Sequence, residues 1–520
     1  MADRSRREML AALIGGVVTL SGCSGFGDDS GGSEPRGETP TAESGGTGGS
    51  DTPTETPQSG DPTPTETESE QSQLAAVERA SAWPNRRGPP SNTGTSATGG
   101  PGPDAAATFS AELRNGQTVS NRAPVVGPDA IYAIAGPATP YDQSPPEFAC
   151  YAYALSREDG SELWRQTLES GEGEENNDLP RDTSLCLGPD GLYAVWARGG
   201  DTFPVRIARL SRADGSEQWR TTVEPTAGNA LQPVVRDRRL YQQFGRRVVV
   251  FDTADGSELW RTSELLVDQA VVTVGPDSLL LYHVTPDRES THALTAFDTA
   301  DQTVRWTEPY SESRRPIPAI DGETVYLADG GSHGMTRIGE AMSDDPTTRP
   351  RRQIHALSLA DGSERWSHTY DTDAIHESVT AGGTSYLTVA DESVYYALGF
   401  PSAEELVGPN ASAAALESLR ERLYRGPNVV ALDRSDGSVV WRTKVGSQAQ
   451  VFQPMVAGPE SLYALYRGVE ADDEQPQVYV IDRATGDVRG SFGPVDTAQP
   501  FAVADGAVYT NRRGDVRAWE

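Results

Sequence analysis

From about residue 120 onward, short apolar strands alternate with polar turns in a pattern that repeats along the chain. In its clearest form, an apolar strand is followed by a turn containing Asp-Gly and by a second strand that carries Trp. Glycine accepts the positive φ angle that a tight turn requires, so each copy predicts a β-hairpin. The full copies end at Trp164, Trp219, Trp260, Trp366 and Trp441; Asp301-Gln302 to Trp306 lacks the glycine, and Thr485-Gly486 to Gly490 lacks the Trp.

A second pattern precedes these hairpins and consists of an apolar strand, a turn and a strand that carries Tyr. Examples run from Gly188-Pro189-Asp190 to Tyr193 and from Asp321-Gly322 to Tyr326. The two patterns together form units of four strands, at a spacing of roughly 40 to 75 residues. Four-stranded units repeated at this spacing are typical of the blades of a β-propeller.

The units account for the chain almost to its C-terminus. Seven complete units begin near residues 123, 183, 231, 269, 317, 385 and 453, and an eighth begins near Gln499 but ends at Glu520 after three strands. The segment Phe109 to Leu113 aligns with a fourth strand. We therefore predict an all-β, eight-bladed β-propeller over residues 81–520, in which the N-terminal strand completes the C-terminal blade and removes two exposed sheet edges. Gly490 predicts that blade seven has the weakest seam.

Insertions occur at one point of the unit only, between its second and third strands. Because strand direction alternates, these loops should emerge on one face, opposite the tight Asp-Gly turns. Variable loops on one side of a rigid scaffold are where such proteins bind partners. The longest contains apolar residues at helical spacing over 411–425, which predicts a helix. The insertions are 136–148, 198–204, 284–291, 329–352, 400–426 and 467–476.

The segment Ala431 to Trp441, read as Ala-Leu-Asp-Arg-Ser-Asp-Gly-Ser-Val-Val-Trp, resembles the tryptophan-docking repeat of pyrroloquinoline-quinone (PQQ) quinoproteins and their non-enzymatic relatives. Trp83-Pro84, Arg87-Gly88 and Thr93-Gly94 resemble the segment that precedes the first blade in these relatives. The resemblance implies a PQQ-like propeller with Trp side chains docked in the seams between blades. A row of aromatics that stacks a ligand is the alternative, although outer strands lie far from the ring centre. The structural docking residues would be Trp164, Trp219, Trp260, Trp306, Trp366 and Trp441.

The PQQ quinoproteins that this chain resembles carry an adjacent Cys-Cys disulfide over the quinone, with carboxylates and an amide that bind Ca²⁺. This chain has three cysteines and no adjacent pair. Cys150 and Cys186 are expected on different blades, as small core residues or, alternatively, as a bridge. The histidines lack zinc-ligand spacing, and acidic loops such as Asp344-Asp345 fit a solvated surface or, alternatively, Ca²⁺. We predict no catalytic residue, no metal site and no cofactor; PQQ with Ca²⁺ is the alternative, with unknown binding residues.

The first residues resemble an export signal of the twin-arginine type, with Arg6 and Arg7 followed by a short apolar stretch. Leu20-Ser21-Gly22-Cys23 resembles a lipobox, which implies lipidation of Cys23; an uncleaved membrane anchor is the alternative. Residues 24–80 are rich in Gly, Ser, Thr, Pro, Glu and Asp and cannot bury enough apolar surface to fold. The expected organisation is a signal peptide over 1–23, a disordered tether over 24–80 and the propeller over 81–520.

The charge balance is strongly acidic. Acidic residues outnumber basic ones 76 to 44, the formal net charge is −32, and Lys444 is the single lysine of the chain. Phosphates would be repelled, which argues against a nucleic-acid partner. High salt screens such self-repulsion, so the composition favours a halophilic protein, with an acidic mesophilic protein as the alternative.

Two functions from different classes follow. The first is a lipid-anchored scaffold that holds a protein partner on the face carrying loops 329–352 and 400–426, at the outer face of the cytoplasmic membrane and without catalysis. Its relatives by resemblance include the BamB lipoprotein subunit of the outer-membrane-protein assembly machinery. The second is a PQQ-dependent dehydrogenase with an atypical site. A quinone and calcium pocket lined by the inner strands would distinguish the second from the first.

Overall fold

The chain divides into two compact units, Met1–Thr63 and Pro64–Glu520. The computed structural model describes parts of the second unit. None of the helices in these parts is long and apolar enough to cross a membrane. The described residues are 88–89, 91–113, 124–136, 148–171, 180–198, 204–224, 233–244, 247–262, 271–284, 292–310, 317–328, 353–369, 387–397, 412–423, 426–446, 451–466, 475–495, 501–512 and 514–520.

The described residues form eight four-stranded antiparallel sheets, which confirms the predicted blades. In each of blades 1 to 7 the strands pair in chain order. Blade 1 contains β2 (Val125–Val126), β3 (Ile131–Ala135), β4 (Phe148–Leu155) and β5 (Glu162–Gly171); blade 2 contains β6 (Pro180–Gly188), β7 (Gly191–Arg198), β8 (Val205–Leu210) and β9 (Glu217–Val223); blade 3 contains β10 (Val234–Arg236), β11 (Arg239–Phe244), β12 (Arg247–Asp252) and β13 (Glu258–Arg261); blade 4 contains β14 (Val271–Val274), β15 (Ser278–Val284), β16 (His292–Asp298) and β17 (Val304–Tyr310).

The remaining blades follow the same order up to the last. Blade 5 contains β18 (Ala319–Asp321), β19 (Thr324–Ala328), β20 (Gln353–Ser358) and β21 (Glu364–Thr369); blade 6 contains β22 (Thr388–Ala390), β23 (Ser393–Ala397), β24 (Val429–Asp433) and β25 (Val439–Thr443); blade 7 contains β26 (Val451–Ala457), β27 (Ser461–Tyr466), β28 (Gln477–Asp482) and β29 (Val488–Phe492); blade 8 contains β30 (Ala502–Ala504), β31 (Ala507–Arg512), β32 (Asp515–Trp519) and β1 (Ala107–Glu112).

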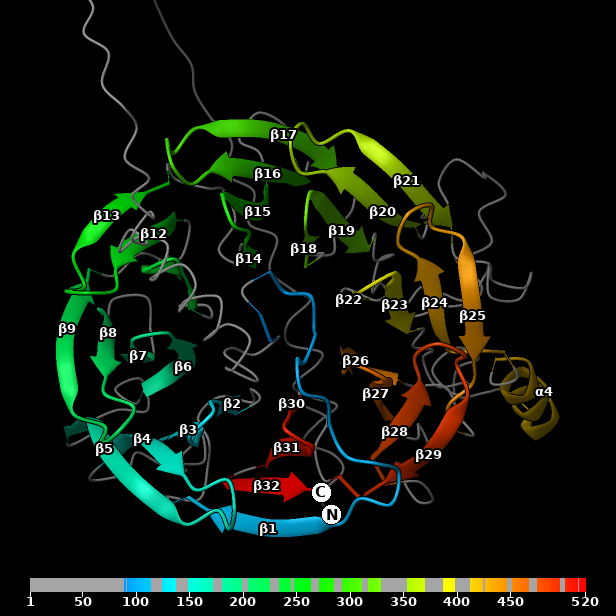
Figure 1. Ribbon diagram of the computed structural model, residues 1–520, viewed down its shortest axis with the longest axis horizontal. Helices are drawn as coiled ribbons and strands as arrows, with labels where there is room; N and C mark the ends of the chain where they lie inside the picture. The colour runs from blue at the N-terminus through cyan, green and yellow to red at the C-terminus, as the bar shows by residue number, and fades with distance from the viewer. Residues whose placement is uncertain are drawn as a thin grey trace, which may run out of the picture. The chain divides into compact units, whose positions relative to one another are not determined.

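Blade 8 joins the two ends of the described chain. Strand β1 pairs with β32 in antiparallel register, from Ala107 opposite Trp519 to Glu112 opposite Asp515. Figure 1 shows β1 beside the C-terminus, on the outside of a ring whose blades follow one another in chain order. The closure predicted from the alignment of Phe109 with a fourth strand is therefore confirmed.

The core lies in the seams between neighbouring blades. Second strands such as β3 and β27 are buried at every position, because both of their faces meet an adjacent blade. Fourth strands are more exposed; in β13 only Trp260 is buried. One apolar cluster joins blade 1 to blade 2, and another joins blade 6 to blade 7. Burial of these clusters, rather than contacts within one sheet, holds the ring together.

The two faces of the ring differ. The turns between first and second strands and between third and fourth strands lie on one face, which we call the turn face. The second strands end and the third strands begin on the opposite face, which we call the loop face, and the strand bounds confirm that the six insertions join second to third strands. Within the longest insertion, α4 (Ala413–Leu423) confirms the predicted helix. Most of loops 329–352 and 400–426 lie outside the described residues.

Candidate functional site

Residues 91–101, which we call the inner belt, lie at the centre of the ring against the first strands of blades 4 to 8. Figure 1 shows this segment in blue, running inside the ring before it reaches β1. Its backbone pairs with the inner edges of successive blades. The carbonyl of Ser91 accepts from Ile320 N at 2.9 Å, that of Thr93 from Val389 N at 2.8 Å and that of Gly94 from Ala457 N at 3.0 Å.

Two residues of the inner belt, Asn92 and Gly94, fix its conformation. Asn92 is buried and adopts a positive φ of 57°, and its amide donates to Val272 O at 3.2 Å and Thr273 Oγ1 at 2.6 Å in β14. Gly94 has φ 69°, and a Cβ there would lie 3.2 Å from Met455 O and from Thr388 Oγ1. Asn tolerates left-handed backbone better than most residues, and Gly tolerates it best. The sequence Asn-Thr-Gly therefore suits this path along the inner strands.

The inner belt leaves the centre over the turn face of blades 7 and 8. Gly100 N donates to the Tyr463 hydroxyl at 3.0 Å, and that hydroxyl donates to Pro101 O at 3.1 Å. Pro103 then covers Gly490, where a Cβ would meet the proline ring at 2.6 Å. Proline here fills the space that a Trp fills in other blades, so the contacts do not support the prediction of a weak seam at blade seven.

The structure places the six predicted docking Trp residues on the outer strands, and five of them contact the turn of the following blade. In five seams the indole Nε1 donates to a backbone carbonyl of that turn, at 2.8 Å from Trp164 to Arg212 and at 2.9 Å in the other four. The ring also covers the turn glycine: a Cβ at Gly215, Gly256 or Gly437 would lie 2.5–2.6 Å from it. Phe109 covers Gly160 in the same way at the closing seam. The glycine is therefore required by the neighbouring blade as well as by its own turn.

The turn residue that accepts from the Trp is an arginine in three blades, and in two of them, Arg434 and Arg483, the side chain reaches back to pair with Asp321 and Asp391 of the preceding blade. At the closing seam, where Phe109 takes the place of the Trp, Arg157 pairs with Asp505 at 2.7 Å in the same way. Arg483 also donates to Gly458 O in its own blade and Tyr395 OH in the other. Each such arginine contacts two blades across a seam on the turn face.

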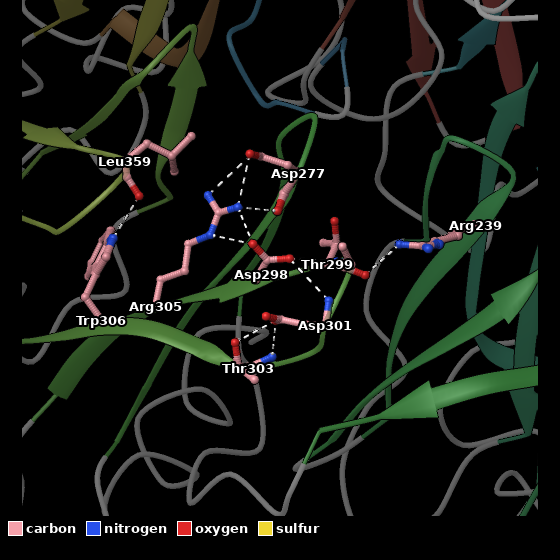
Figure 2. Close-up of polar contacts among 10 residues, drawn as sticks. Arg239, Asp277, Asp298, Thr299, Asp301, Thr303, Arg305, Trp306 and Leu359 are labelled. Atoms are coloured by element: carbon pink, nitrogen blue, oxygen red, sulfur yellow. Dashed lines mark hydrogen bonds and ion pairs between the residues drawn. The ribbon is translucent and has the colours of Figure 1, made fainter. Parts of the chain in front are cut away.

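The seam between blades 3 and 4 departs from this arrangement, and Figure 2 shows its contact between Arg239 and the carbonyl of Thr299. Gln302 replaces the turn glycine and keeps a φ of 65°. The carbonyl of Thr299 accepts from Arg239 at 2.7 Å, and Trp260 Nε1, although buried, has no hydrogen-bond partner within the part of the chain that the structure describes. Within blade 4, Arg305 pairs with Asp277 and Asp298, and its hydrogen bond holds the pKa of the Asp298 carboxyl below its usual value. The contacts favour this seam as the weakest of those described.

The cysteines and histidines within the described residues occupy structural positions. Cys150 in β4 and Cys186 in β6 are buried free thiols on different blades, and burial raises both pKa values, which keeps the thiols protonated and unreactive. His283 contacts Thr295, and His355 contacts Glu364. Nowhere in the described ranges do three or more His, Cys, Asp or Glu side chains gather as a possible metal site.

Several predicted sites lie outside the described residues, including Arg6, Arg7, Cys23 and the acidic loop at Asp344. Two features were missed by the sequence analysis. One is the inner belt, for which Thr93-Gly94 was the only signal. The other is a buried cluster in which Glu169 of blade 1 accepts from Trp196 Nε1 at 2.8 Å and from Arg206 at 3.0 Å in blade 2.

A family model described as outer membrane protein assembly factor BamB matches residues 205–399 and 354–489, which together span more than half of the chain. The chain belongs to this PQQ-like β-propeller family. No curated protein matches it. Among solved structures, the quinohemoprotein alcohol dehydrogenase of Comamonas testosteroni is 11% identical with a TM-score of 0.51, and covers 86% of this chain and 83% of its own. BamB of Moraxella catarrhalis is 12% identical with a TM-score of 0.47, and the match covers 80% of this chain and 97% of BamB. The designed protein Ika8 is 11% identical with a TM-score of 0.50, and the match covers 79% of this chain and 99% of Ika8.

At these low sequence identities the solved structures show similarity of fold alone. The hypothesis of a PQQ-dependent dehydrogenase therefore has to be judged on the residues of this chain. The adjacent cysteine pair that this reading implies has no counterpart in the sequence. The inner belt lines the first strands of blades 4 to 8 at the centre of the ring, the region in which the dehydrogenase alternative would place a quinone and calcium pocket. Of the groups implied for that alternative, the chain lacks the cysteine pair.

Proposed function

We propose that the protein is a membrane-anchored extracytoplasmic scaffold that binds a protein partner and catalyses no reaction. The observation that carries this proposal is the inner belt, because the chain's own backbone pairs with the first strands of blades 5 to 7 at the centre of the ring, the region in which the dehydrogenase alternative would place its pocket. The BamB description of the matching family model supports a role in assembling proteins. The rigid eight-bladed ring supplies the scaffold, and its loop face supplies the adaptable surface.

The partner is expected on the loop face, over loops 329–352 and 400–426. A stable complex needs roughly 800 Å² from each protein, and the turn face offers mainly short turns. Helix α4 is attached to the ring by Leu416, which packs against the apolar cluster of blades 5 and 6, while Ala413, Ala414 and Glu417 are exposed. Half-attached helices of this kind present side chains to a partner at low conformational cost.

The absence of catalysis is tested with the purified full-length protein, measured with and without added PQQ and Ca²⁺. The proposal expects no stoichiometric quinone absorption band and no dye reduction with alcohols. A bound quinone with dye-reducing activity would establish the dehydrogenase instead. Binding is tested by crosslinking in cells with and without residues 402–424, replaced by a short Gly-Ser bridge. An unchanged partner list in a folded variant would remove this loop from the interface.

Anchoring is proposed to depend on Cys23, with Arg6 and Arg7 directing export. The change Cys23→Ser should release the protein from the membrane or leave the precursor uncleaved, because the serine hydroxyl is not acylated by the lipoprotein pathway. Membrane fractionation and the mass of the mature N-terminus report the result. The change Cys150→Ser serves as the control, since that thiol is buried in the propeller. A membrane-bound Cys23 variant with an unaltered N-terminus would refute the lipid anchor.

A further inference from the structure

The inner belt is bound to the ring as a peptide would be. It contacts the ring through backbone hydrogen bonds to Ile320, Val389 and Ala457 and through the amide of Asn92. Main-chain pairing to a strand edge is one recurring way in which proteins bind an extended peptide. The three-residue strands β18 and β22 and the C-terminal end of β26 offer such edges at the centre of the ring.

The composition of the belt explains why it can be separated from the fold. Residues 91–98 read Ser-Asn-Thr-Gly-Thr-Ser-Ala-Thr, and none of them belongs to an apolar core cluster. The single alanine, Ala97, is exposed. Removing the segment therefore uncovers polar groups that water can solvate, such as the Thr273 hydroxyl. Each blade retains its four strands.

The same contacts define what the site selects. Asn92 places a short amide between Val272 O and Thr273 Oγ1, in left-handed backbone that disfavours β-branched residues. At Gly94 any side chain would press on Met455 O and Thr388 Oγ1, which themselves hydrogen bond at 2.8 Å. An extended ligand must therefore present Asn, one small polar residue and Gly in that order.

We propose that the inner edges of blades 5 to 7, with β14 of blade 4, form a binding site for an extended polypeptide segment with an Asn-x-Gly turn. Residues 91–96 are its intramolecular ligand, and an equivalent segment of another polypeptide binds there when the belt is displaced. This inference rests on the proposed binding function and adds to the loop face a second site, with a ligand of stated chemistry.

The experiment uses a variant that lacks residues 81–100 but retains Pro103 and β1. A fluorescein-labelled synthetic peptide with the sequence of residues 88–100 is titrated against it, followed by anisotropy. Saturable binding to the deletion variant and none to the intact chain is the expected result, because the belt occupies the site. Peptides carrying Asn92→Ala or Gly94→Val should bind at least about tenfold more weakly, the effect of losing a buried hydrogen bond or forcing a contact. A peptide with Ala97→Ser is the matched control and should bind like the original. Equal binding of all peptides, or none to a folded variant, would overturn the proposal.

A second variant keeps the test decisive if the deletion does not fold. A protease site is inserted after Gly102, which is exposed and has open space around its Cα, and the full chain is cleaved after folding. The N-terminal fragment should then exchange with the labelled peptide under native conditions, as measured by gel filtration and mass spectrometry. A fragment that never exchanges would show that the belt is part of the core. If the peptide titration or the fragment exchange fails, the peptide site is refuted but the scaffold function is not. That function is tested separately, by crosslinking in cells and by the measurements with PQQ and Ca²⁺.

Discussion

At the residue scale, a single position in each third-to-fourth-strand turn decides how well two blades dock. The turn glycine allows the positive φ and leaves room for the Trp of the preceding blade, as at Gly362 beneath Trp306. Gln302 adopts the positive φ at a cost that glycine avoids, and among the described residues the Trp260 indole has no hydrogen-bond partner. A residue change in the seam between blades 3 and 4 should therefore increase the stability of the propeller.

The change Gln302→Gly should stabilise the propeller by about 1 kcal/mol, because left-handed backbone costs a non-glycine residue roughly that much. Chemical denaturation followed by Trp fluorescence measures the difference. The reverse change Gly362→Gln is the matched control: its Cβ would lie 2.9 Å from the Trp306 ring, so it should destabilise by more than that amount. The free energy of unfolding should rise in the Gln302→Gly variant and fall in the Gly362→Gln variant. Changes of the same sign would contradict this account of the seam.

The hydrogen bond of the docking Trp can be isolated by comparing two seams. Trp306→Phe removes an indole that donates to Leu359 O at 2.9 Å, whereas Trp260→Phe removes one without a partner. Both changes delete similar volume, so Trp306→Phe should cost about 1 kcal/mol more, the usual worth of one hydrogen bond. Equal losses in urea titrations would show that the indole hydrogen bond contributes nothing.

At the element scale, the turns are closed by aspartates whose carboxylates accept from backbone N–H groups two residues ahead. Asp159 accepts from Ser161 N, and Asp361 accepts from the Ser363 hydroxyl and from Ser363 N. These hydrogen bonds lower the pKa of both carboxyls, that of Asp361 chiefly through the Ser363 hydroxyl. A lowered folded-state pKa means that the unfolded chain takes up protons first on acidification. These turns therefore stabilise the fold fully above the ordinary Asp pKa and lose this contribution as the pH falls through the lowered value.

The melting temperature of the propeller should consequently fall steeply below about pH 4, the ordinary pKa of Asp. Calorimetry between pH 6 and the acid limit of solubility measures the slope. A variant with Asp159→Asn, Asp214→Asn and Asp361→Asn keeps an acceptor oxygen at each turn but no titrating proton, so its slope should be shallower. An unchanged slope would assign the acid sensitivity to other carboxylates.

Closure by β1 is the other element-scale device. Deleting residues 105–113 leaves blade 8 with three strands and removes Phe109 from the closing seam at Gly160. The melting temperature should fall sharply and aggregation should increase, because an open edge recruits other strands. Deletion of residues 30–70 is the control and should leave the melting temperature unchanged. Similar melting temperatures for both deletions would argue against closure by this strand.

At the scale of the whole molecule, charge is the dominant property. A net charge of −32 opposes compaction, and salt shortens the range of that repulsion from about 10 Å at 0.1 M to about 3 Å at 1 M. The seam arginines, such as Arg483 with Asp391, offset only part of it, since exposed pairs contribute little.

The melting temperature should therefore rise by several degrees between 0.1 M and 2 M KCl, as calorimetry would show. Sucrose at equal osmolality is the control: it leaves charge repulsion unscreened and should give a smaller rise. A flat response to KCl would remove the support for adaptation to high salt.

The sequence by itself determined the blades, because strand alternation, turn glycines and the repeated Trp are local signals that recur in most of the units. It also determined the closure, since Phe109 to Leu113 reads as a fourth strand and the last unit lacks one. The six insertions and the helix within the longest followed from the same alignment.

Only the tertiary structure decided where the inner belt lies and which seam is weak. The belt residues are small and polar and carry no periodicity, so no local signal could reveal that Asn92 meets β14, 180 residues away. The effect of Gln302 likewise depends on Trp260 in the preceding blade, and Gly490 is compensated by Pro103, which precedes the first blade. In each case the energy comes from a contact between distant segments, and a pattern within one segment carries no information about its partner.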